Sequence, residues 1–198
     1  MLIPRLRLAD LASAACCALL VLAVSAPPSW SRQTKPIIGQ GRSGLPVAVS
    51  EMRDAIIAAA RTGSLDELLI PIQWNELPPD FGDLSVKDTI AQWKTNSPDG
   101  SGREWLARLI NLLDAPYVAL RQGRDVENAK IYIWPAFIDL PLNKLSPALH
   151  VELLRLVPAT EAKRIIAAGR YDGFGLAIGA DGTWHAFKKT VLPRKPPK

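Results

Sequence analysis

The sequence has almost no residues able to perform thiol or metal chemistry. It contains two cysteines, Cys16 and Cys17, and two histidines, His150 and His185. Both cysteines lie in the first apolar run, so the rest of the chain cannot form a disulfide, use a thiolate nucleophile or bind zinc through sulfur. No HExxH, HxH, GxSxG or SxxK pattern occurs. The sequence therefore predicts no cofactor and no metal site.

A clustered basic surface is also missing. The chain has 24 Lys or Arg against 19 Asp or Glu and a pI near 9.4, but the excess lies at the two ends. Residues 47–187 carry 14 basic against 18 acidic side chains. A nucleic-acid interface needs basic residues gathered on the folded surface, so we expect no nucleic-acid partner.

The first 31 residues have the pattern of a secretory signal peptide. Arg5 and Arg7 precede an apolar run from Leu11 to Ala26, and small residues and prolines follow. Cleavage is expected between residues 25 and 31, with a periplasmic or secreted product and no stable membrane span. An uncleaved anchor is the alternative, although the run is shorter than the roughly 20 residues that cross a bilayer.

The remaining chain divides into three parts by composition. Residues 32–46 are rich in Gly, Pro and charge and are predicted to be a flexible linker. Residues 47–188 form the predicted single domain. Residues 189–198 end in LPRKPPK and are predicted to be a basic disordered tail.

The order of periodic segments predicts an α+β fold. Helical spacing dominates up to residue 115, and its strongest stripe is Leu106, Leu109, Ile110 and Leu113 after a predicted capping box of Ser101 and Glu104. Strand candidates follow at residues 117–121 and 130–134, then two short helices and a hairpin at 174–187. We expect N-terminal helices packed with a small antiparallel sheet that ends in this C-terminal β-hairpin.

The hairpin turns at Ala180-Asp181-Gly182, where the Asp-Gly pair supplies a positive φ. Adjacent side chains on a strand point to opposite faces, so at most one of Trp184 and His185 belongs to the exposed side of the sheet. Which of the two shares the inward face depends on the hairpin register, which the sequence leaves open.

Three side chains are candidates for general acid or base catalysis. His185 follows Asp181 across the turn, where a carboxylate could orient the imidazole. Glu76 and Asp80 lie with Asp83 in the proline-rich loop 73–83, where two carboxylates could act as the acid and base of a glycosidase and Trp74 could stack on a sugar ring. The alternatives are an exposed strand histidine and solvated or capping carboxylates.

Tryptophans are the candidate binding residues. Trp74, Trp134 and Trp184 could form an exposed aromatic surface for carbohydrate or a protein partner. Packing in or at the edge of the core is the alternative for each.

The segments WNELPPDFGD, DGSGREWLARLINLL, IYIWPAFIDLPLNKLSP, VELLRLV and IGADGTWHAF resemble a family of small exported proteobacterial proteins. The resemblance covers the chain from about residue 53 to 188 and implies a location in the cell envelope. It implies no activity and no functional residue.

Two functional hypotheses follow. The first is a non-enzymatic interaction or binding domain whose partner is an envelope protein or polysaccharide. The second is a cell-wall or polysaccharide hydrolase that uses the carboxylates of the loop or His185. The second requires that two of these groups approach one cleft.

Overall fold

The computed structural model describes residues 37–121 and 130–189. Within these ranges it contains six α-helices, five strands and three short 3-10 helices. The predicted signal peptide, the start of the predicted linker and the predicted tail from residue 190 lie outside the described residues.

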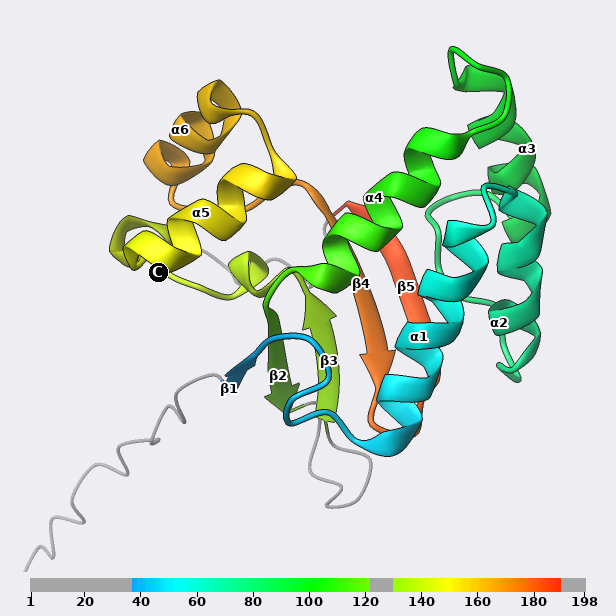
Figure 1. The fold of residues 1–198 in the computed structure, drawn as a ribbon, viewed down its shortest axis with the longest axis horizontal. Coiled ribbons are helices and arrows are strands. Elements are labelled where there is room, and N and C mark those ends of the chain that lie inside the picture. Colours follow the sequence, from blue (N-terminus) through cyan, green and yellow to red (C-terminus); the bar gives the residue numbers. More distant parts are fainter. Residues whose placement is uncertain (1–36, 122–129, 190–198) are drawn as a thin grey trace, which may run out of the picture. The chain divides into compact units, whose positions relative to one another are not determined.

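A five-stranded antiparallel sheet forms the centre of the domain (Figure 1). The strands lie side by side in sequence order and pair only with their sequence neighbours. They are β1 (Ile37–Gly39), β2 (Tyr117–Arg121), β3 (Lys130–Trp134), β4 (Phe174–Gly179) and β5 (Trp184–Lys189). With helices before the sheet's main strands and a hairpin at its end, the prediction of an α+β fold is confirmed.

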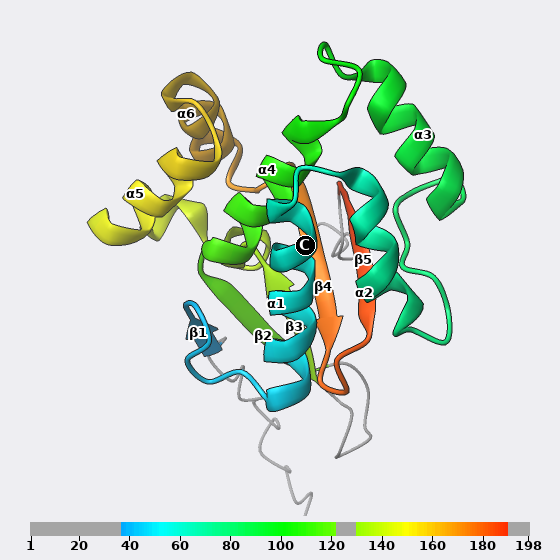
Figure 2. The same cartoon turned by 45° about the vertical axis from the view of Figure 1, so that its right-hand side comes forward.

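The helices form two groups along the chain (Figures 1 and 2). Between β1 and β2 lie α1 (Val47–Arg61), α2 (Leu69–Gln73), α3 (Val86–Asn96) and α4 (Arg103–Asp114); between β3 and β4 lie α5 (Pro147–Leu156) and α6 (Ala159–Ala168). Helices α1 and α4 pack against each other and against β4. They therefore form the layer that covers one face of the sheet.

In the predicted stripe of α4, Leu106, Leu109 and Leu113 are at most 2% exposed, and Ile110 is half-buried against the same core. The predicted capping box is wrong. The helix begins at Arg103, and its N-cap is Gly102 in a left-handed conformation with no side-chain cap. The carboxylate of Asp99 instead accepts hydrogen bonds from the backbone N–H groups of Ser101 and Gly102, so the turn before the helix is held by an aspartate.

The C-terminal hairpin contains a bulge that sets its register. Ala177 pairs with Ala186 and Ile178 pairs with Trp184, which leaves His185 as an extra residue on β5. Because of this extra residue, Trp184 lies on the helix-covered face with Phe187, while Ala186 lies on the opposite face. His185 is exposed. The question that the alternation of side chains left open is therefore decided in favour of a buried Trp184.

An aromatic cluster fills the space between the helices and the C-terminal hairpin. The rings of Trp93 and Trp105 are stacked with centroids 4.9 Å apart, and the edge of Phe187 meets Trp93 at 5.6 Å. Phe81 contacts Trp93 and Trp184 at centroid distances of 5.4 and 5.2 Å. Rings at these separations are within the favourable range for aromatic pairs, so the loop that carries Phe81 is part of the core.

The predicted linker is wrong for the part that the structure describes. Ile37–Gly39 form the edge strand β1, which pairs with β2, and the turn after it contacts the core through a hydrogen bond from the Tyr117 hydroxyl to the carbonyl oxygen of Ser43. A Cβ atom at Gly39 would lie 2.3 Å from the Tyr117 ring. The folded domain therefore begins before residue 47.

Among the described residues, no helix has the length and apolar character required to cross a membrane.

Candidate functional site

The segment after α1 has two apolar sides. Its 3-10 helix η1 (Leu65–Leu68) and α2 bury Leu65, Leu68 and Ile72 against the core. Ile70 and Trp74, which are four residues apart and so share one side of a helical segment, face solvent. Only one of the two apolar sides of this segment is buried in the core of the domain, and the other stays exposed to solvent.

The exposure of this segment is large for apolar residues. Leu69, Ile70, Trp74 and Leu77 are 39%, 52%, 59% and 77% exposed. Single exposed apolar side chains are common on proteins, but contiguous sets of them mark interaction surfaces. We call these four residues, all within nine positions of the chain, the α2 surface.

The loop that follows the α2 surface is fixed to the sheet. The side-chain amide of Asn75 donates to the carbonyl oxygen of Trp184 at 2.9 Å and accepts from the backbone N–H of Trp184 at 3.1 Å. Farther along, the backbone of Asp80 bridges to β5, donating to His185 O and accepting from Phe187 N. Trp74 and Leu77 are thus held on a rigid support, which lowers the entropy lost on binding.

The surroundings of the α2 surface are acidic. Residues 65–84 contain five carboxylates and no Lys or Arg. Two of the carboxylates are neutralised, Asp66 by Lys94 and Asp80 by Lys188. The remaining three have no ion pair within the described part of the chain; they are Glu67, Glu76 and Asp83.

The predicted catalytic residues are placed in different environments. Glu76 is exposed in the loop. Asp80 lies beside β5, where the Lys188 ammonium holds the pKa of its carboxyl below the ordinary value. A catalytic acid needs the opposite shift, and Asp80 is therefore better explained as an anchor of the loop.

His185 and Asp181 lie near each other, as the sequence analysis expected. A Cβ atom at Gly179 would be 2.5 Å from Asp181 Oδ1 and 2.7 Å from His185 Nε2. The Asp181 carboxylate is occupied by the backbone N–H of Thr183 at 3.0 Å. Partial burial is the largest single influence on the pKa of this carboxyl and raises it. The hydrogen bonds from Thr183 and the nearby imidazole together outweigh burial, so the pKa lies below its ordinary value.

Two of the three predicted binding tryptophans are corrected. Trp134 and Trp184 are 0% exposed, and the indole N–H of Trp184 donates to the carbonyl oxygen of Ala186 at 3.1 Å. Both belong to the core, in agreement with the alternative interpretation. Trp74 alone among the three has an accessible ring.

The structure adds residues that the sequence analysis did not select. Ile70 and Leu77 join Trp74 on the α2 surface; the spacing of Ile70 and Trp74 was the available signal, obscured by Pro71 between them. Within the described residues no group of His, Cys, Asp and Glu could hold a metal ion.

No known protein family, curated protein or solved structure matches this chain.

Proposed function

We propose that the protein is a non-enzymatic binding domain that uses the α2 surface to bind a polypeptide with an apolar, basic face. The observation that carries this proposal is the exposure of four large apolar side chains on a rigid segment, at 39–77% each. A partner would remove this apolar area from water, which contributes roughly 25 cal/mol for each Å² buried.

The chemistry of the surface favours a polypeptide over a polysaccharide. Sugars bind to aromatic rings flanked by polar side chains that hydrogen-bond the hydroxyl groups. Besides Trp74, the exposed side chains of residues 69–77 are Leu69, Ile70 and Leu77, which offer no hydrogen bonds, and the polar Gln73 and Glu76, so apolar side chains predominate. Aliphatic residues around a tryptophan are typical of the centre of a protein interface.

The charge of the surroundings specifies the partner further. Glu67, Glu76 and Asp83 have no ion pairs in the described residues and lie in a 20-residue stretch without a basic side chain. Complementary charges at the rim of an interface steer the partner and accelerate association. We therefore expect Lys or Arg beside the apolar residues of the partner. The signal-like N-terminus supports a partner in the cell envelope.

The test is an NMR titration of the ¹⁵N-labelled protein with defined peptides. The probe is an amphipathic peptide of about 15 residues made of Leu and Lys, and its control has Glu in place of Lys. We expect saturable shifts of the Trp74 indole N–H and of backbone amides in residues 65–84 with the Lys peptide only. A cello-oligosaccharide tests the polysaccharide alternative at the same signals.

Two double variants distinguish binding at the α2 surface from nonspecific binding to exposed apolar side chains. Trp74→Ala with Leu77→Ala should weaken binding at least about tenfold, because central aromatic residues dominate interface energies. Val151→Ala with Leu154→Ala removes two other exposed apolar side chains, which are 58% and 44% exposed on α5, and should leave binding unchanged. Equal weakening by both pairs, or equal binding of the Lys and Glu peptides, would contradict the proposal.

A further inference from the structure

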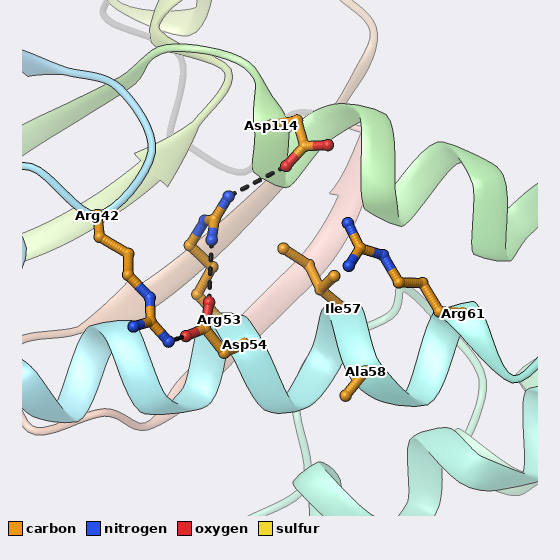
Figure 3. Close-up of a pocket in the computed structure, with 7 residues that line it drawn as sticks. All are labelled: Arg42, Arg53, Asp54, Ile57, Ala58, Arg61 and Asp114. Carbon is orange, nitrogen blue, oxygen red and sulfur yellow. Dashed lines mark hydrogen bonds and ion pairs between the residues drawn. The ribbon is translucent and has the colours of Figure 1, made fainter.

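A hollow of about 430 Å³ lies between α1, the end of α4 and the turn after β1 (Figure 3). Its volume is within the usual range for small-molecule sites. Three arginines and two aspartates line it, together with Ile57 and Ala58 of α1; the charged residues are Arg42, Arg53, Arg61, Asp54 and Asp114. The lining therefore has one positive charge more than it has negative charges.

Two of the three arginines have structural partners. The guanidinium of Arg53, with its side chain 9% exposed, donates to the Leu113 carbonyl oxygen at 3.0 Å, to Asp54 Oδ1 at 3.0 Å and to Asp114 Oδ1 at 3.1 Å. Arg42 forms an ion pair with the other oxygen of Asp54. These contacts attach α1 to the end of α4 and the turn after β1 to α1, and they account for both aspartates.

Arg61 is the remaining cation. In the part of the chain that the structure describes, its side chain makes no hydrogen bond or ion pair, and Figure 3 shows it beside Ile57 in the hollow. Its charge acts on the buried Arg53, whose pKa is lowered chiefly by desolvation; Asp114 opposes this shift, and Arg42 and Arg61 add to it. Arg61 lies near the buried charge of Arg53 and has no carboxylate partner within the described residues. The electrostatic potential in the hollow is therefore positive.

We propose that this hollow binds an oxyanion, a carboxylate or phosphate group, with Arg61 as the side chain that pairs with it. The planar guanidinium matches the two oxygens of such a group. Ile57 and the small Ala58 of α1 supply an apolar floor to the hollow, which suits a short hydrocarbon attached to the anion. Asp114, whose carboxylate also lines the hollow, directs the ligand away from the end of α4.

A purely structural role of Arg61 makes a different prediction. A basic residue in the last turn of a helix stabilises the helix by interacting with its dipole, and Arg61 occupies that position in α1. In that case Arg61→Gln would lower stability slightly and would change no ligand affinity. The two roles are distinguished by measuring both quantities on one variant.

The experiment titrates the full-length protein with sodium phosphate and, separately, with sodium butyrate, at constant ionic strength adjusted with NaCl. Amide shifts followed by NMR should saturate at the lining residues of α1 and at Asp114. Saturation with phosphate identifies a phosphate ligand, and saturation with butyrate identifies a carboxylate with an apolar body. Linear, non-saturating shifts with both salts would overturn the proposal.

Variants then assign the binding to the hollow. Arg61→Gln should weaken the saturating anion by about tenfold, the loss of one charge-assisted hydrogen-bonding partner. Ala58→Leu, which keeps every charge and fills the exposed floor, should also weaken it. The control is Arg170→Gln, which removes an exposed arginine outside the hollow and changes the net charge equally. Equal affinities of the Arg61→Gln and Arg170→Gln variants would refute the proposed site.

Discussion

Replacing Arg53 by Met should destabilise the domain more than any exposed charge substitution. The Met side chain retains an apolar stem of similar length but cannot donate the two hydrogen bonds that join α1 to Leu113 and Asp114 of α4, or the third, to Asp54 within α1. The Arg53 side chain is 9% exposed, whereas those of Asp54 and Asp114 are 29% and 37% exposed. The cost therefore falls mainly on the buried carbonyl of Leu113, because the two carboxylates can return to water.

The magnitude follows from these exposures. A hydrogen bond involving a charged group contributes about 1.5–3 kcal/mol, and breaking a fully buried ion pair costs about 3–5 kcal/mol. Because both carboxylates regain water in the variant, their share is smaller, and the carbonyl of the fully buried Leu113 carries much of the loss. We expect the free energy of unfolding to fall by about 2–4 kcal/mol in Arg53→Met.

Urea unfolding followed by circular dichroism measures this change, with the m-value as a check that the transition stays two-state. The control is Arg42→Met, whose side chain is 70% exposed; it should cost less than about 1 kcal/mol. A double-mutant cycle with Asp114→Asn should show a positive coupling energy between Arg53 and Asp114. A loss below about 1 kcal/mol for Arg53→Met would refute the assignment of this arginine as the link between α1 and α4.

Two further predictions concern the edge strand and the tyrosines. Gly39→Ala should lower the free energy of unfolding by about 1–3 kcal/mol, since its Cβ would overlap the Tyr117 ring; urea unfolding measures the change, and an unchanged free energy of unfolding would contradict the packing of β1. Burial raises the pKa of all three tyrosines, that of Tyr171 to about 12. A raised folded pKa favours the neutral phenol, so this stabilisation is complete below the unfolded value of about 10 and is lost as pH rises through 12. Absorbance of tyrosinate should therefore appear above pH 10, together with unfolding, and titration at an ordinary pKa in the native protein would contradict the burial.

The sequence predicted those parts of the fold that depend on local patterns. The stripe of α4 and the Asp-Gly hairpin turn are determined by side-chain spacing and by the φ angle at Gly182, which is 88°. The bulge at His185 could not be predicted, because strict alternation is the pattern that a bulge breaks. Strand β1 was hidden for a different reason: its three residues gain their stability from Tyr117, a residue 78 positions beyond Gly39 in the sequence.

The candidate site was predicted only in part. Trp74 was selected as an aromatic of a proline-rich loop, and it is exposed. Trp134 and Trp184 have the same side chain but lie on strands: the inward face of Trp134 is fixed by pairing with Leu176, 42 positions away, and that of Trp184 by the bulge in its hairpin. The hollow was not predicted, since Arg53 and Asp114 are 61 positions apart and only the packing of α1 on α4 brings them together.

The position of β1 has a practical consequence for producing the domain. A chain shortened to start at Val47 would keep every helix but would leave the backbone N–H and C=O groups of β2 unpaired along one side, with Tyr117 uncovered. Unpaired strand edges recruit other chains, so such a fragment is expected to self-associate and precipitate. A fragment that retains residues from Lys35 onward would keep this edge closed and is the better choice for expression.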